Sequence, residues 1–150
     1  MLASLVLAAA TAATPLAGLH YLVGSWNCTY RAGKMSFAYH ATYASDIDGR
    51  ILREIASFAG GGDEELVAYD APHHRWTAVV LGDEGTETVM RASGSDPNHI
   101  AYRSVYPETN LAVTFDRISA TKYTLHGTFR SGGKTINSVD TCSRALSSRA

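Results

Sequence analysis

From Gly18 onward, the chain alternates short runs of β-branched, aromatic and other apolar residues with turn residues at regular intervals. Val, Ile, Thr and the aromatic residues favour extended backbone, whereas Gly, Asp, Asn and Pro favour turns. No stretch repeats its apolar positions with helical spacing over three turns. The pattern predicts about ten strands, over residues 21–31, 34–46, 51–59, 65–70, 75–82, 86–94, 99–106, 111–118, 122–130 and 135–145.

Short loops join these runs. Three dipeptides predict two-residue hairpin loops, because glycine adopts positive φ at little energetic cost: Ala32-Gly33, Asp48-Gly49 and Gly132-Gly133. A long meander of such strands closes into a barrel to remove its edges. Opposed residues of an antiparallel pair have numbers with a constant sum, so the first loop places Tyr30 opposite Met35. The second loop places Tyr43 opposite Glu54.

The two cysteines lie in the first and last predicted strands, at Cys28 and Cys142. They form neither a C-x-x-C motif nor a zinc-ligand pattern, so we expect a structural disulfide. If they are directly opposed, Trp26 lies opposite Arg144, on the same face that the hairpin loops assign to these strands. The sequence therefore predicts an all-β fold: one up-and-down antiparallel barrel, closed by a disulfide between its first and last strands.

The N-terminal residues form a different kind of segment. Residues 2–10 are an apolar run, and Ala10-Thr11-Ala12 matches the small-x-small pattern of signal peptidase sites, although no Lys or Arg precedes the run. The run is too short for a membrane-spanning helix. We expect a signal peptide over 1–13, a single barrel domain over 14–150, and a periplasmic or secreted protein without membrane insertion. The alternative is a frayed apolar end on a cytosolic protein.

Composition limits the partners. The chain has 150 residues, 45% of them hydrophobic, and a net charge of −1 with both signs scattered along it. This length suits one core. The absence of a basic stripe argues against nucleic-acid binding.

Gly24-Ser25-Trp26 at the start of the first strand, together with Arg144 at the end of the last, resembles the calycin signature of lipocalins and their relatives. The resemblance implies that the arginine packs across the tryptophan and closes one end of the barrel. About ten strands without a terminal helix or a helical pair after the first strand are most similar to nitrobindin-like barrels and the DUF1579 family. The segment Tyr69-Asp70-Ala71-Pro72 is similar to a turn of that family.

Nitrobindins bind haem through a histidine near the C-terminus, and this chain departs from that pattern. Its last histidine is His126, which the register places on the outside of the barrel. His73 and His74 are adjacent in a predicted turn and point apart, which disfavours a shared metal. We therefore expect neither haem nor a metal.

Alternation along the predicted strands gives an inward face that is rich in tyrosine. Such a lining suits a small hydrophobic or aromatic molecule. The alternatives are that the rings only fill the core of a structural or interaction barrel, or that the lumen is catalytic. The candidate ligand-binding residues are Tyr30, Tyr39, Tyr43, Tyr102, Tyr106, Phe115, Arg117, Tyr123 and Asp140.

Two inward carboxylates, Asp140 and Glu54, are the candidates for chemistry. A buried carboxylate without a partner has a raised pKa, which suits general acid–base catalysis in a small lyase or isomerase. The simpler interpretation is a hydrogen bond or ion pair near a barrel mouth. We expect a binding protein rather than an enzyme. Gly60-Gly61-Gly62, followed by Asp63, predicts a mobile loop at that mouth.

Overall fold

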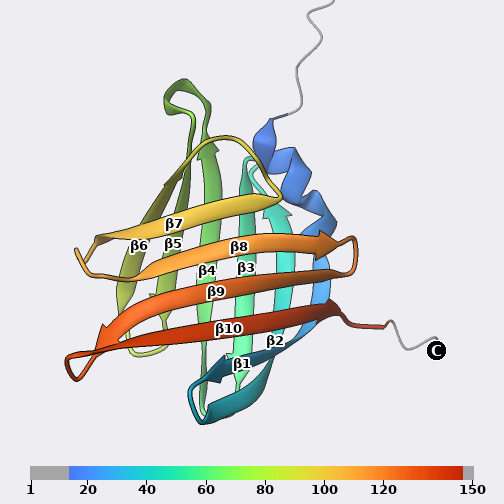
Figure 1. Ribbon diagram of the computed structural model, residues 1–150. Coiled ribbons are helices and arrows are strands. Elements are labelled where there is room, and N and C mark those ends of the chain that lie inside the picture. Colours follow the sequence, from blue (N-terminus) through green and yellow to red (C-terminus); the bar gives the residue numbers. More distant parts are fainter. Residues whose placement is uncertain (1–13, 147–150) are drawn as a thin grey trace, which may run out of the picture.

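The computed structural model describes residues 14–146 (Figure 1). The predicted signal peptide over 1–13 lies outside the described residues. The described residues form two short 3-10 helices, η1 (Pro15–Leu22) and η2 (Ala71–His73), and ten strands. The strands are β1 (Gly24–Ala32), β2 (Met35–Asp46), β3 (Ile51–Phe58), β4 (Gly61–Asp70), β5 (Arg75–Gly82), β6 (Glu87–Ser93), β7 (His99–Tyr106), β8 (Ala112–Ser119), β9 (Lys122–Ser131) and β10 (Lys134–Arg144).

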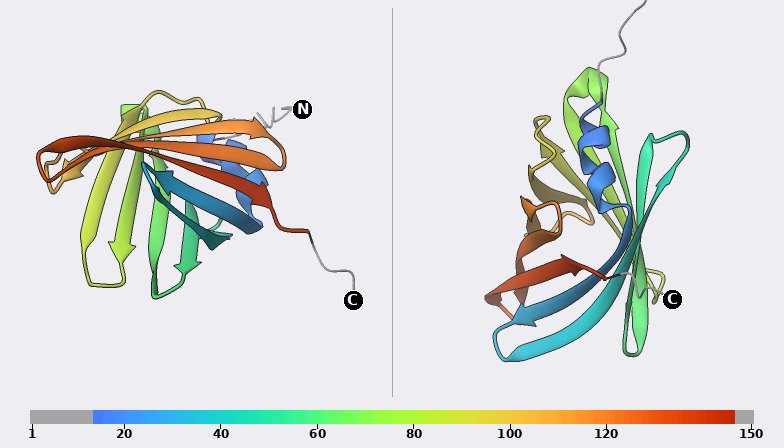
Figure 2. Two further views of the ribbon diagram at one scale, coloured as in Figure 1. Left: turned by 60° about the horizontal axis from the view of Figure 1, so that its bottom comes forward. Right: turned by 90° about the vertical axis from the view of Figure 1, so that its right-hand side faces the viewer.

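The ten strands form a closed antiparallel barrel in which each strand pairs with its neighbours in sequence, and β1 pairs with β10 (Figures 1 and 2). Cys28 is opposed to Cys142 and bonded to it, and Trp26 is opposed to Arg144. The predicted fold, closure and disulfide are confirmed. None of the helices among residues 14–146 is long and apolar enough to cross a membrane.

The first hairpin differs from its predicted register by two residues. Ala32 pairs with Met35, so the loop is Gly33-Lys34, with Gly33 at a φ of 59°. A shift of two residues keeps every side chain on its predicted face, because faces alternate with a period of two. The second hairpin has the predicted pairing of Tyr43 with Glu54, although its loop spans four residues, 47–50.

Helix η1 lies across one end of the barrel (Figure 2, right), where the sequence predicts no helix. Leu16, Leu19 and Leu22 project from it into the core and are 2–3% exposed. Eight residues are too few to show helical periodicity, and the predicted first strand includes the last two of them. We call this end the closed end.

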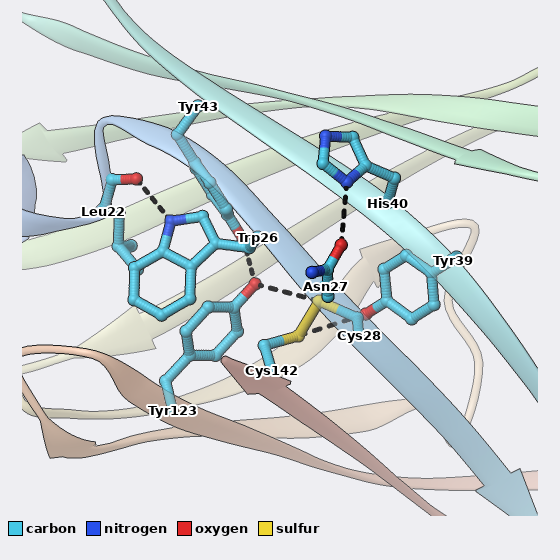
Figure 3. The surroundings of a disulfide bond; sticks show 9 residues. All are labelled: Leu22, Trp26, Asn27, Cys28, Tyr39, His40, Tyr43, Tyr123 and Cys142. Carbon is cyan, nitrogen blue, oxygen red and sulfur yellow. Dashed lines mark hydrogen bonds between the residues drawn. A yellow bond between two sulfur atoms is a disulfide. The ribbon is translucent and has the colours of Figure 1, made fainter. Parts of the chain in front are cut away.

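Trp26 forms the core of the closed end and is fully buried. Its indole N–H donates a hydrogen bond to the carbonyl of Leu22 at 2.6 Å (Figure 3). The Arg144 guanidinium lies 4.6 Å from the Trp26 ring centroid and donates hydrogen bonds to the carbonyls of Tyr21 and Val23. These contacts tie η1 to the first and last strands.

Gly24 makes the close approach of Arg144 possible. It has a φ of 119°, and a Cβ at this position would lie 3.0 Å from Arg144 Nη1. Glycine is the residue that adopts such a conformation without strain.

Candidate functional site

A cavity of about 420 Å³ opens at the end of the barrel opposite η1. Five aromatic side chains form much of its wall: Tyr30, Phe37, Tyr39, Phe58 and Phe129. Tyr30 and Phe37 stack with ring centroids 4.9 Å apart, and Phe58 lies 5.8 Å from Phe37. Phe37 remains 38% exposed, so the aromatic wall extends to solvent at the mouth.

A second, smaller space of about 60 Å³ lies deeper in the barrel, beneath η1. Leu19 and Leu22 of η1 line it, together with residues from the strands. Glu54 and Glu65 line both spaces, and therefore lie between the open cavity and the closed end.

Glu54 and Glu65 are directly opposed on β3 and β4. Glu54 is only 7% exposed. Burial raises its pKa well above the ordinary range, the charge of Glu65 raises it further, and a hydrogen bond with Tyr43 opposes the shift. Burial likewise raises the pKa of Glu65 to about 7, with a smaller contribution from the charge of Asp63. Near neutral pH, the pair formed by Glu54 and Glu65 therefore favours a state in which at least one of the two carboxyl groups is protonated.

Two aspartates complete the acidic lining. Burial raises the pKa of Asp140 to about 6, against a hydrogen bond with Tyr39 that lowers it. Burial also raises the pKa of Asp63, and the nearby charge of Asp83 adds to this shift. The cavity therefore holds four carboxyl groups, contributed by β3, β4 and β10.

The cavity lining has no basic side chain to match these acids, as far as residues 14–146 are concerned. The outer face of the same two strands is different, since Arg53 on β3 forms an ion pair with Glu64 on β4 at 2.7 Å. On the outside of this hairpin the acid thus has a basic partner, whereas the acids on the inside have none among the described residues.

The predicted ligand-binding residues do not all lie in one place. Tyr30, Tyr39 and Asp140 line the open cavity. Tyr43, Tyr102 and Phe115 line the smaller space. Tyr123 is fully buried between Trp26 and Tyr43, and its hydroxyl lies 2.8 Å from the Tyr43 hydroxyl (Figure 3). The two remaining residues lie elsewhere.

Tyr106 is outside the barrel and 59% exposed, so its predicted inward position is wrong. The register between β6 and β7 shifts by one residue, because Met90 pairs with Ser104 whereas Val89 pairs with Tyr106. An extra residue in one strand reverses the alternation beyond it.

Arg117 pairs with Tyr123 as predicted, but its side chain does not reach the cavity. Its guanidinium lies 4.0 Å from the ring centroid of Tyr21 in η1. The position of η1, which was not anticipated, gives Arg117 this partner at the closed end.

The sequence does not predict Asp63 and Glu65 as site residues, because the glycines before them indicate a loop. Gly61 and Gly62 instead belong to β4, and the turn is at residues 59–60. A two-residue turn at Ala59-Gly60 would have given the register that opposes Glu65 to Glu54. Residues 63–67 are Asp-Glu-Glu-Leu-Val and do not alternate between polar and apolar residues, so this turn was the available signal.

Within residues 14–146, no three His, Cys, Asp or Glu side chains are grouped so that they could hold a metal ion. His126 is exposed on the outer face, as predicted. His73 lies at the surface, where its Nδ1 is 2.8 Å from a carboxylate oxygen of Asp70.

No protein-family model matches the chain, and no curated protein matches it. Among solved structures it is similar to a redesigned β-barrel, with 11% sequence identity and a TM-score of 0.43. The match covers 85% of this chain and 94% of that chain.

Proposed function

We propose that the protein is an exported binding protein that holds a small, largely apolar ligand in the open cavity of its barrel. The observation that carries this proposal is a cavity of about 420 Å³ with five aromatic side chains in its wall. Small-molecule sites commonly have volumes of about 300–1,000 Å³ and combine apolar walls with a few polar groups. A barrel that served only as a scaffold would be expected to fill this space with side chains.

The calycin kind of barrel forms part of this proposal. Gly24-Ser25-Trp26 and Arg144 supply the resemblance, and the contact of 4.6 Å between the Arg144 guanidinium and the Trp26 ring supports it. Closure of one end by these residues leaves the other end available for ligand entry.

Export is supported by two features. The disulfide joins residues 114 positions apart, and such bonds persist in oxidising compartments. The apolar run and small-x-small pattern within residues 1–13 are typical of a signal peptide. Export is tested by expressing the full chain and sequencing the N-terminus of the exported product. A product that stays in the cytosol and retains residues 1–13 contradicts export.

The binding proposal is tested with a neutral fluorescent probe, N-phenyl-1-naphthylamine, and by native mass spectrometry of the purified protein. We expect saturable fluorescence enhancement with one site per barrel, and an increase in Tm with probe concentration. The test includes a panel of neutral, cationic and anionic aromatic compounds. The proposal is refuted if none of them gives an adduct, saturable fluorescence or a thermal shift.

A second candidate is a small lyase or isomerase. The favouring observation is that Glu54 and Asp140 both line the open cavity with raised pKa values, each beside a tyrosine. A carboxylate with a pKa near the working pH is an effective general base. The carboxylate of Glu54 or Asp140 would remove a proton from a substrate carbon next to a carbonyl group. The resulting carboxylic acid would then return a proton to the substrate.

This candidate predicts that the protein catalyses exchange of such carbon-bound protons with D₂O in small aromatic ketones, measured by NMR. Glu54→Gln or Asp140→Asn should abolish the exchange while Glu64→Gln, on the outer face, should not. Equal exchange rates with and without the protein would remove this candidate.

A further inference from the structure

The carboxyl groups of the cavity are the least explained feature of the barrel. Glu54 is more than nine-tenths buried, faces the open cavity and has no Lys, Arg or His ion-pair partner in the described part of the chain. Asp63, Glu65 and Asp140 face the same cavity. Over the whole sequence, 14 acidic residues are nearly balanced by 13 Lys and Arg residues, so this one-sided lining is not a consequence of composition.

A buried carboxylate is unfavourable unless it has a hydrogen-bond or charge partner. Tyr43 and Glu65 are hydrogen-bond partners of Glu54, but neither supplies a positive charge. Because no basic side chain among residues 14–146 lines this cavity, an incoming molecule is the remaining source of a positive charge. A metal ion fits poorly, since the described residues contain no metal-ligand cluster and the surrounding walls are aromatic and aliphatic. Hard cations prefer a shell of several oxygen ligands.

The walls instead match an organic cation. Tyr30, Phe37 and Phe58 form a connected aromatic group near the mouth, with neighbouring ring centroids 4.9 and 5.8 Å apart. Aromatic faces attract ammonium groups and also bury apolar surface. Glu54 and Glu65 lie deeper, where the open cavity meets the smaller space.

We propose that the ligand of this cavity is an organic amine with an aromatic or aliphatic body, whose ammonium group lies against Glu54, Glu65 and Asp140. This inference rests on the proposed binding function and specifies the charge of the ligand. The body of the ligand lies among the aromatic rings near the mouth. The ammonium group supplies the positive charge that the described lining lacks, and a bound cation favours the ionised form of each carboxyl group.

The test uses three probes with the same aromatic body and different charges. They are the cation of 2-(1-naphthyl)ethylamine, the neutral 2-(1-naphthyl)ethanol and the carboxylate anion of 1-naphthylacetic acid. Affinities are measured by isothermal titration calorimetry at pH 8, below the pKa of the amine. We expect the amine to bind at least about tenfold more tightly than the alcohol, and the carboxylate more weakly than both, as single ion pairs of this kind change affinity by about one order of magnitude.

Variants assign the preference to the named residues. Glu54→Gln/Glu65→Gln should reduce the affinity for the amine by about tenfold or more, while the affinity for the alcohol stays the same or rises. Glu64→Gln is the matched control, because Glu64 neighbours Glu65 on β4 but points outward to Arg53. It should leave all three affinities unchanged. A thermal melt of each variant verifies that the barrel is folded.

The outcomes separate this inference from the binding function itself. If the alcohol or the carboxylate binds wild-type protein as tightly as the amine, the cavity binds ligands but the inferred charge is wrong. Tighter binding of the alcohol would mean that protonated carboxyl groups act as neutral hydrogen-bond donors, which also overturns the inference. If none of the three probes binds, the binding function fails as well.

Discussion

Glu54 and Glu65 lie directly opposite one another on β3 and β4, and both face the interior of the barrel. Like charges at opposed positions of a sheet are mutually destabilising. Glu54 is also buried and Glu65 is half-buried, and this loss of hydration raises both pKa values. The barrel is therefore most stable when these groups are protonated, and a cationic ligand would relieve the same repulsion without a proton.

The first prediction concerns pH. The folded-state pKa of Glu65 is about 7, above its ordinary value of 4.5, so the folded protein holds a proton that the unfolded chain releases between these values. The free energy of unfolding should fall as pH rises from 5 to 8, by on the order of 2 kcal/mol, or roughly 5 °C in Tm. Asp140, with a pKa of about 6, should act in the same direction. Calorimetric melts of the ligand-free protein measure this slope.

Replacing Glu54 and Glu65 tests whether this pair causes the pH dependence of stability. Glu54→Gln/Glu65→Gln should flatten the dependence and raise the Tm at pH 8, since glutamine has no charge to bury. Glu64→Gln should retain the wild-type slope, because Glu64 forms its ion pair on the outer face. The explanation is wrong if the Tm rises between pH 5 and 8, or if the double variant melts with an unchanged slope.

The second prediction concerns Arg144 at the closed end. Its guanidinium covers the Trp26 ring and donates hydrogen bonds to the carbonyls of Tyr21 and Val23. Arg144→Ala should lower the free energy of unfolding by about 2–3 kcal/mol, the sum of a cation–π contact and hydrogen bonds from a charged donor. The free energy of unfolding of Arg144→Lys should lie between those of the wild type and Arg144→Ala, because an ammonium group lacks the planar fork of the guanidinium. Urea titration measures both.

Arg31→Ala is the control for this series. Arg31 is exposed on the outer face of β1, so its removal should change the free energy of unfolding by no more than about 0.5 kcal/mol. Equal effects of the Arg144 and Arg31 variants would show that the contact with Trp26 contributes nothing to stability.

The third prediction concerns the disulfide. Cys28 and Cys142 are 114 positions apart, and a cross-link that closes so long a loop restricts the unfolded chain strongly. Cys28→Ala/Cys142→Ala should lose up to about 5 kcal/mol of unfolding free energy. Reductant should shift the urea midpoint of the wild type toward that of the variant and leave the variant unchanged. Coincident midpoints for the oxidised wild type and the variant would contradict this account.

The barrel itself could be predicted because its evidence is repeated along the chain. Alternation with a period of two and frequent glycine turns specify the strands, and the pairing of Cys28 with Cys142 agrees with the inward face that the hairpins define. The error of two residues in the first hairpin was harmless, since it left Tyr30 on the inner face. The prediction of barrel closure depends only on which side chains face inward, and many positions along the chain determine this together.

The candidate site was harder to predict because it depends on local departures from this regularity. The register shift between β6 and β7 moves Tyr106 outside, and a short helix gives Arg117 another partner. Glu65 was hidden behind a glycine run that extends a strand instead of ending it. Each of these features is local, so the strand pattern along the rest of the chain gives no warning of it.

The last prediction locates ligand binding in the cavity rather than on the outer surface. Thr88 on β6 is half-buried and lines the open cavity, with a small side chain that leaves much of the space free. Thr88→Trp should fill part of this volume and reduce the affinity for N-phenyl-1-naphthylamine by about tenfold or more, because the indole would occupy the position of the ligand's body. Thr42→Trp adds the same ring at an exposed position on β2 and should leave the affinity unchanged. Fluorescence titration measures both affinities, and the Tm of each variant indicates whether the fold persists. If the two variants bind the probe equally well while remaining folded, the probe occupies the outside of the barrel, and the open cavity is not the binding site.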